Sequence, residues 1–182
     1  CPENAIEMVE HESGRWFVSE TEKGTLVHAR LGMAEGNSGK LVTIIRKKAK
    51  EIASQQGCGL IIVDGSPGTG CPVIASVTGA SYLLIVTEPT ISGLHDLKRA
   101  VELASHFRVK CGVCVNRADI NDEVTSEIKD FCSAKGIVFL GAIPYDKDVT
   151  AAQIAGKTVV EHSDGPASTA IKELWNRIIT EI

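Results

Sequence analysis

Two short runs near the start of the chain alternate apolar and polar residues in the manner of β-strands. They are RWFVSET (15–21) and TLVHARL (25–31), and Glu22, Lys23 and Gly24 separate them. Two such runs with a short polar spacer predict a β-hairpin, because a tight turn joins the strands and glycine accepts the positive φ that such turns require. We expect a hairpin over 15–31.

The hydrophobic period then changes from two residues to that of a helix. Between Gly39 and about Gln56, apolar side chains recur every three or four positions, at Leu41, Ile44, Ile45, Ala49 and Ile52. Ser38 is a suitable N-cap because its hydroxyl can accept a hydrogen bond from the first turn. The pattern predicts a helix over 39–56 with one buried stripe.

Further along, strand-sized apolar runs alternate with helical patterns. The predicted strands are LIIVD (60–64), YLLIVTE (82–88), CGVCVNR (111–117), IVFLGAIP (137–144) and a weak one at 158–160. One predicted helix begins near Pro72, and three others span about 93–107, 123–135 and 167–182. This alternation is typical of right-handed βαβ units, with helices on both faces of a mostly parallel sheet. We expect one doubly wound α/β domain.

Composition narrows the class of protein. The chain has 182 residues, 43% of them hydrophobic, and a formal net charge of -4, so no basic surface for nucleic acid is expected. The longest apolar runs are too short to cross a membrane, and the first residues lack the basic start and apolar centre of a signal peptide. We expect a cytoplasmic protein without a membrane span.

The six cysteines are widely spaced in the sequence, except for Cys111 and Cys114. Scattered cysteines of this kind do not indicate a disulfide framework. Residues three apart on a strand face opposite ways, so Cys111 and Cys114 are expected to be buried thiols rather than two ligands of one metal.

The ligand-binding residues of doubly wound sheets lie beyond the carboxyl ends of the strands. The run LIIV leads into Asp64, Gly65, Ser66, Pro67 and Gly68. An acid there can hold a water of a hydrated magnesium ion, and the glycines let backbone N–H groups approach phosphate. This arrangement is similar to a Walker B segment, and the alternative is that Asp64 only caps a turn.

The next strand end carries Asn116 and Arg117. The Asn116 amide offers a donor and an acceptor and could read an adenine edge, with Arg117 stacking or pairing beside it. Asn116 could equally cap a turn. Pro144, Tyr145 and Asp146 form another turn that is expected at the same edge.

The stretch AEGNSGKL (34–41) nearly spells a phosphate-binding loop. A P-loop requires Ser or Thr directly after its lysine, and here Leu41 follows Lys40. A lysine at a helix start opposes the helix dipole unless an anion lies near, so Lys40 is a candidate to face a phosphate or a partner, the alternative being a solvated side chain. No G-x-G-x-x-G occurs, which places a Rossmann oxidoreductase last.

Five segments together carry a family resemblance: LGMAEGNSGKLVTIIRKKAKEIA, LIIVDGSPGTGCPVIASVTGA, LLIVTEPTISGLHDLKRAVELA, VNRADIN and GAIPYD. They resemble the MinD/ParA/Mrp superfamily of P-loop ATPases of the SIMIBI type, and more closely its branch with an inserted ferredoxin domain. The resemblance covers about 13–182, and it implies binding and slow hydrolysis of ATP in a homodimer.

Carried over residue by residue, the resemblance makes Asp64 the Walker-B-type acid near magnesium, and Gly65, Pro67 and Gly68 part of a loop near the γ-phosphate. Asn116 corresponds to the residue that reads adenine, with Arg117 beside it. Pro144 and Asp146 lie where the chain passes the base, and Gly36–Lys40 corresponds loosely to a switch region.

The start of the chain, Cys1-Pro2-Glu3-Asn4-Ala5-Ile6, is similar to the end of a four-cysteine iron–sulfur run, so residues 1–12 are interpreted as the remnant of a ferredoxin-like segment. Cys1 would bind a cluster only in the longer architecture. The resemblance also implies an iron–sulfur or electron-transfer partner.

The family's phosphate loop, K-G-G-x-G-K-[ST], does not occur in this sequence. The resulting hypothesis is the C-terminal part of a MinD-like ATP-binding protein with weak or no hydrolysis. The alternative is a non-catalytic interaction or dimerisation domain of the same fold.

Overall fold

The computed structural model describes residues 13–32, 36 and 39–182. The chain divides into two compact units, residues 1–76 and 77–182, and each unit is described by itself. The expectation of a single domain over 13–182 stays a prediction, and the expected N-cap Ser38 and the segment 1–12 with Cys1 lie outside the described residues.

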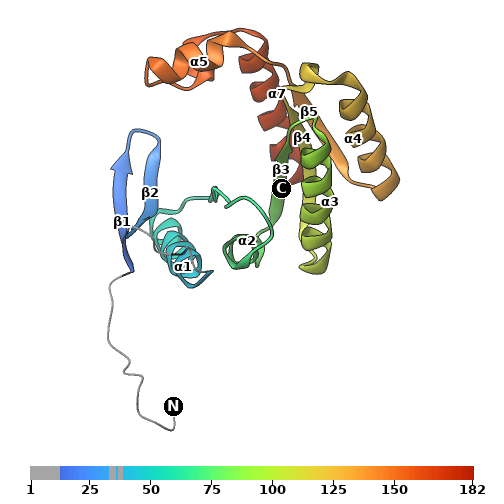
Figure 1. Ribbon diagram of the computed structural model, residues 1–182. Helices are drawn as coiled ribbons and strands as arrows, with labels where there is room; N and C mark the ends of the chain where they lie inside the picture. Colours follow the sequence, from blue (N-terminus) through green and yellow to red (C-terminus); the bar gives the residue numbers. More distant parts are fainter. Residues whose placement is uncertain (1–12, 33–35, 37–38) are drawn as a thin grey trace. The chain divides into compact units, whose positions relative to one another are not determined.

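The described part of the first unit contains a hairpin, one long helix and all but the last residue of a second helix (Figure 1). These elements are β1 (Gly14–Thr21), β2 (Gly24–Leu31), α1 (Gly39–Gln56) and α2 (Cys71–Val77). The strands are antiparallel, with Thr21 opposite Gly24, so that Glu22 and Lys23 form the turn. Gly24 has φ +126°, as its role beside the turn requires. The predicted hairpin and the bounds of α1 are confirmed.

The prediction of a strand at LIIVD (60–64) is wrong. These residues are irregular, and Leu60, Ile61, Ile62 and Val63 are exposed, Ile62 by 75%. A strand exists only where a neighbouring backbone completes its hydrogen bonds. Within the described residues no strand pairs with this run, so its apolar character alone does not produce one.

The stripe of α1 is also less buried than expected. Among its described side chains none is fully buried, and Ile44 is 39% exposed. The helix period was therefore predicted correctly, while the burial of Leu41 and its neighbours was not.

The second unit is a parallel sheet with helices on both faces. Its elements are β3 (Tyr82–Thr87), α3 (Ile91–His106), β4 (Lys110–Asn116), η1 (Ala118–Ile120), α4 (Asp122–Lys135), β5 (Val138–Ile143), α5 (Lys147–Ile154), α6 (Val159–His162) and α7 (Pro166–Glu181). The strand order is β3-β4-β5, all parallel. The predicted α/β class with a parallel sheet is confirmed.

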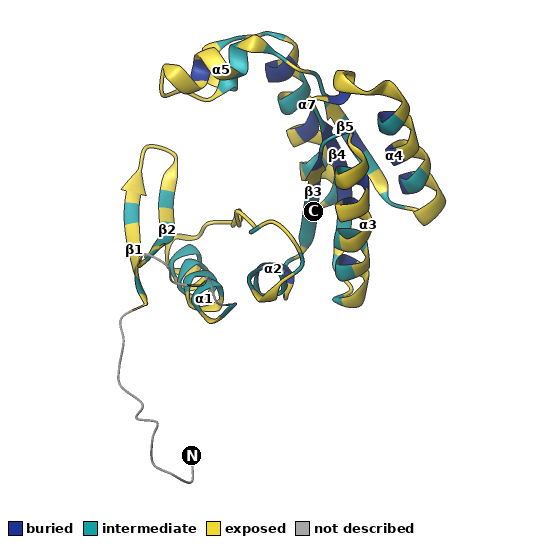
Figure 2. Ribbon diagram, in the orientation of Figure 1, coloured by how far each residue is buried: buried dark blue, intermediate teal, exposed yellow. Residues whose placement is uncertain are grey.

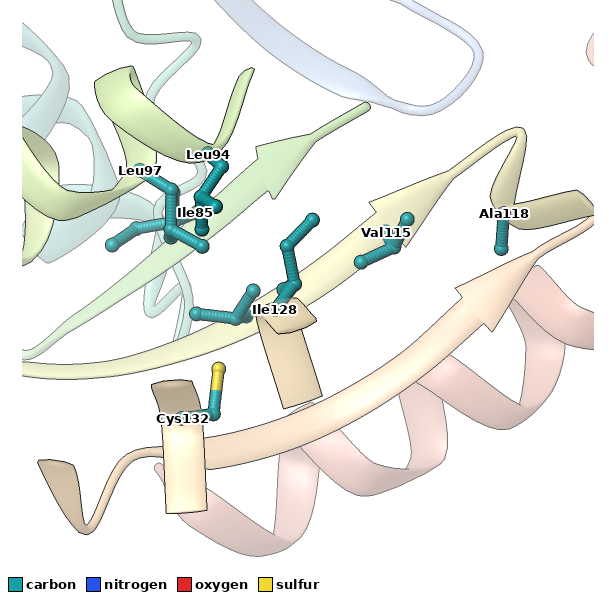
Figure 3. Packing of buried hydrophobic residues seen from close by; sticks show 8 residues of the cluster. Ile85, Leu94, Leu97, Val115, Ala118, Ile128 and Cys132 are labelled. Carbon is teal, nitrogen blue, oxygen red and sulfur yellow. The ribbon is translucent and has the colours of Figure 1, made fainter. Parts of the chain in front are cut away.

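Buried residues concentrate in this sheet and the helices against it (Figure 2). On one face, Leu94 and Leu97 of α3 and Ile128 and Cys132 of α4 pack with Ile85 and other strand residues (Figure 3). On the other face, Leu174 of α7 packs with Cys114 and Leu140. The apolar residues that recur at helical spacing in α3 and α4 therefore pack against the apolar residues of the strands, as the sequence predicted.

The predicted weak strand at 158–160 is instead the start of α6. Thr158 and Glu161 form a capping box, in which the Thr158 hydroxyl accepts from the Glu161 N–H and the Glu161 carboxylate accepts from the Thr158 N–H at 3.1 Å. Such a box fixes a helix start. The β-branched residues Val159 and Val160 suggested a strand, but the local capping interaction decides the conformation.

Candidate functional site

Three parallel strands end side by side in the second unit, and the candidate nucleotide-facing residues follow them. β3, β4 and β5 end at Thr87, Asn116 and Ile143, and Asn116 and Ile143 are register partners. Of the predicted site residues, the structure places Asn116, Arg117, Pro144 and Asp146 at this edge. The strand directions therefore bring them together as expected.

Asn116 is the last residue of β4 and is half-buried. No hydrogen bond joins its amide to other groups in the described part of the chain. A side-chain amide has an NH₂ group that donates and an oxygen that accepts. Without a protein partner, it can pair with a ligand that presents one acceptor and one donor side by side. Asn116 does not cap the following helix, because Asn121 does so by accepting from the Val124 N–H at 3.0 Å. The turn-capping alternative for Asn116 therefore has no support at α4.

Arg117 directs its side chain toward Glu88 at the end of the neighbouring strand. Its Nη1 lies 3.5 Å from Glu88 Oε1, and both side chains are about half exposed, at 52% and 45%. An exposed pair of this kind contributes at most about 1 kcal/mol. The backbone of Arg117 has φ +53°, a left-handed conformation that starts the turn η1. The pair orients the Arg117 side chain toward the end of β3.

Asp119 and Tyr145 connect the loops that follow β4 and β5. Asp119 Oδ1 accepts a hydrogen bond from the Tyr145 N–H at 2.7 Å, across 26 positions of sequence. No role for Asp119 or Glu88 was predicted from the sequence. The one available signal was the acid three residues after Asn116 in NRAD, which indicates a carboxylate near the same strand end.

Asp146 uses both carboxylate oxygens within the fold. Its Oδ1 accepts from the Asp148 N–H at 2.9 Å and caps α5, and its Oδ2 accepts from the Ala167 N–H at 3.1 Å in the first turn of α7. Anions stabilise helix N-termini in this way. Asp146 therefore anchors the loop after β5, and both of its carboxylate oxygens are engaged within the fold.

The other predicted site residues belong to the first unit. Asp64 and Lys40 are exposed, and Lys40 is the second residue of α1. Gly39 packs closely on the start of α2. A β-carbon at position 39 would lie only 2.9 Å from the Cys71 carbonyl oxygen. Arg46 Nη1 donates to the Ala75 carbonyl at 2.6 Å and holds the same two helices together. The start of α1 is thus fixed beside the end of the loop 65–70.

That loop has the backbone expected of a glycine-rich turn. Gly68 has φ +88°, and the Gly70 carbonyl accepts from the Val73 and Ile74 N–H groups to begin α2. Gly65, Pro67 and Gly68 are exposed, and no neighbouring heavy atom within 4 Å restricts a β-carbon at Gly65 or Gly68. An anion could approach the backbone there.

A magnesium ion fits Asp64 only together with phosphate and water. Among the described residues no three His, Cys, Asp or Glu side chains gather as a metal site. Mg²⁺ commonly takes one or two carboxylates, with phosphate oxygens and waters completing its shell. An exposed Asp64 is compatible with magnesium binding that phosphate oxygens and waters complete. It is not compatible with a magnesium site made of protein side chains alone.

The described cysteines do not form a cluster-binding group. Cys111 packs in the α3–α4 core and Cys114 in the α7 core, on opposite faces as predicted. Burial raises the pKa of the Cys114 thiol to about 11 and also raises the pKa of Cys111 and Cys132. Cys58 and Cys71 are exposed, and among the described residues no three His, Cys, Asp or Glu side chains gather around a common point. The described cysteines therefore do not provide the group of thiolates that an iron–sulfur cluster needs.

The three-stranded parallel sheet with helices on both faces defines the class of fold as α/β, and similar solved structures identify it as the P-loop NTPase type. No protein-family model matches the chain. Solved structures with this fold include MinD of Aquifex aeolicus, with a TM-score of 0.68 and 22% identity over 91% of this chain and 69% of that one. Another is MinD of Pyrococcus horikoshii complexed with Mg-ADP, with a TM-score of 0.66 and 16% identity over 90% of this chain and 66% of that one.

Sequence relatives give a finer comparison. An uncharacterised protein of Methanocaldococcus jannaschii is 32% identical over 173 residues, which are 94% of this chain and 56% of that protein. An iron–sulfur cluster carrier protein of Pyrococcus horikoshii is 28% identical over 158 residues, covering 79% of this chain and 53% of that protein. The comparisons confirm the resemblance to the MinD/ParA/Mrp superfamily. The chain spans about half the length of the curated relatives that it matches.

Proposed function

We propose that this chain binds the base side and the magnesium side of ATP, as the C-terminal part of a MinD-like ATPase that is associated with an iron–sulfur module. The observation that carries the proposal is the Asn116 amide, half-buried at the end of a parallel strand, without a protein partner among the described residues and flanked by the ordered loops of Arg117 and Asp119. In this fold such a position favours recognition of a nucleobase edge.

The roles of the residues follow from their chemistry. The Asn116 amide would accept from the adenine amino group and donate to a ring nitrogen. Asp64 would orient the water molecules around a magnesium ion. That ion, when bound, would neutralise charge on the phosphates. Lys40 would approach a phosphate or a partner. The backbone around Pro144 and Tyr145 would contact the base.

Hydrolysis by this chain is proposed to be weak or absent. Phosphoryl transfer depends mainly on positioning and on charge stabilisation of the γ-phosphoryl group, and the phosphate loop with its lysines supplies much of both. The sequence contains no K-G-G-x-G-K-[ST] run. Robust turnover that disappears in Asp64→Ala would contradict this part of the proposal.

The direct test is calorimetric titration of the full chain with ATP and magnesium. We expect binding that Asn116→Ala weakens by about 10-fold or more, equivalent to about 1.4 kcal/mol. Asn176→Ala, an exposed position on α7, is the matched control and should bind like the wild type. Absence of binding in the wild type would overturn the proposal.

Iron–sulfur chemistry enters as a partner rather than as a resident group of the described residues. The named relatives include cluster carriers, and the remnant at 1–12 with Cys1 is interpreted as the end of a cluster-binding segment of a longer architecture. We propose an iron–sulfur or electron-transfer protein as partner, a homodimer as the assembly and the cytoplasm as the location. None of the described helices is long and apolar enough to cross a membrane.

A second candidate function is a non-catalytic interaction domain. The exposed apolar run Leu60–Val63 favours it, because four consecutive exposed apolar residues are typical of a contact surface. Light scattering of the purified chain tests self-association, and the calorimetric titration separates the candidates, since an interaction domain gives no heat with ATP and magnesium.

A further inference from the structure

Beyond the last paired residues of β4 and β5, one side chain holds the two strand ends together. The ladder ends at the pair Asn116 and Ile143. Past it, Asp119 Oδ1 accepts from the Tyr145 N–H at 2.7 Å. A backbone amide bonded to a carboxylate is among the stronger hydrogen bonds of proteins. The two loops therefore keep a defined separation beside the Asn116 amide.

Each loop is also anchored on its own side. On the β4 side, the buried Thr125 hydroxyl donates to the Ala118 carbonyl at 2.8 Å. On the β5 side, the Asp146 carboxylate binds the starts of α5 and α7. Asp119 thus joins two loops that are already fixed to their helices, so its carboxylate has a settled position.

This position bears on which base the site can read. A carboxylate that recognises guanine accepts from both its N1–H and its exocyclic amino group, which occupies both oxygens, whereas adenine offers no such pair of donors. In this structure Oδ1 of Asp119 is already bound to a backbone amide. Bidentate recognition of guanine would therefore require Oδ1 to accept a second hydrogen bond beside the one from the Tyr145 N–H, whereas adenine makes no such demand on Asp119.

We infer that Asp119 is a positioning residue for nucleobase selectivity: it holds the Tyr145 loop beside Asn116 and so favours adenine over guanine. The inference rests on the proposed nucleotide-binding function. Asparagine at position 119 keeps an oxygen that can accept from the Tyr145 N–H, whereas alanine keeps none. The two substitutions therefore separate positioning from charge.

The experiment combines two measurements on the full chain, its Asp119→Asn and Asp119→Ala variants, and Asp130→Ala as a control at an exposed position of α4. Calorimetry compares ATP with GTP, both with magnesium. Hydrogen exchange followed by NMR reports the Tyr145 amide without any nucleotide.

The expected result is that the wild type prefers ATP and that Asp119→Asn and Asp130→Ala keep this preference. Asp119→Ala should weaken ATP binding by about 10-fold and speed exchange of the Tyr145 amide by a similar factor, as loss of a hydrogen bond to a charged group predicts. Retention of function by asparagine distinguishes positioning from a general need for a negative charge.

Three results would overturn the inference. A wild-type preference for GTP that Asp119→Asn abolishes would mean that Asp119 reads the base directly. Unchanged exchange of the Tyr145 amide in Asp119→Ala would mean that the carboxylate does not hold the loop. If the exchange behaves as expected and neither nucleotide binds, the proposed function fails, and the selectivity claim fails with it while the loop contact stands.

Discussion

The phenol of Tyr82 in β3 packs over Gly112 in β4. Both residues lie on the sheet face that α7 covers, and a β-carbon at position 112 would collide with Tyr82 Oη and with the side chain of Leu140. The Tyr82 hydroxyl is buried and makes no hydrogen bond within the described part of the chain. Glycine at 112 is thus required by space rather than by backbone conformation.

Gly112→Ala is expected to destabilise the chain by about 1–3 kcal/mol, because an extra methyl group in a packed core forces neighbours to move. Denaturant unfolding monitored by circular dichroism measures the change. Gly141→Ala in β5 is the matched control, because its β-carbon would meet no heavy atom within 4 Å. Equal stability of the two variants would contradict the packing described here.

Tyr82→Phe is expected to leave stability unchanged or to raise it by about 1 kcal/mol at neutral pH. The reason is that a buried hydroxyl without a partner carries a desolvation cost that phenylalanine removes. Thermal unfolding of the two proteins at pH 7 gives the comparison. A clear loss of stability would show that the hydroxyl has a hydrogen-bond partner.

The pH dependence of Tyr82 has a defined sign. Burial, then the charge of Glu181, then Cys111 raises the pKa of Tyr82 from 10.0 to about 12. The unfolded chain therefore releases this proton first, so the stability contribution is fully present below pH 10 and is lost between pH 10 and about 12. We expect the free energy of unfolding to fall more steeply in this interval for the wild type than for Tyr82→Phe, and parallel curves would refute the shift.

Asn121→Ala is expected to cost about 1 kcal/mol, because it removes the side chain that accepts from the Val124 N–H at the start of α4. Asn121→Asp should keep most of the stability, since aspartate is an equally good N-cap. Denaturant midpoints of the three proteins provide the measurement. A larger loss in the aspartate variant than in alanine would contradict the capping role.

Ile128→Ala is expected to lower the free energy of unfolding by about 2–5 kcal/mol. Ile128 is fully buried between α4 and the sheet, and its truncation leaves a cavity. Glu127→Ala is the neighbouring control on an exposed position and should change stability by less than about 0.5 kcal/mol. Chemical unfolding at 25 °C with both variants tests the ranking.

Part of the candidate site was predictable and part was not. Asn116, Arg117 and Pro144 were placed correctly at one sheet edge, because parallel strands end on the same side. The pairing of Arg117 with Glu88 was not predicted, since it joins two strand ends that lie 29 positions apart in sequence. Asp64 was expected at the end of a strand, and the structure places it in an irregular segment.

By itself the sequence determined the elements whose cause is local: the hairpin at β1 and β2, the bounds of α1, and the core stripe of α3, where Leu94 and Leu97 recur at helical spacing. Only the tertiary structure decided whether LIIV pairs as a strand and which amide the Asp119 carboxylate binds. The physical reason is that helices and tight turns complete their hydrogen bonds within a few residues. A strand and a loop contact need partners from distant parts of the chain.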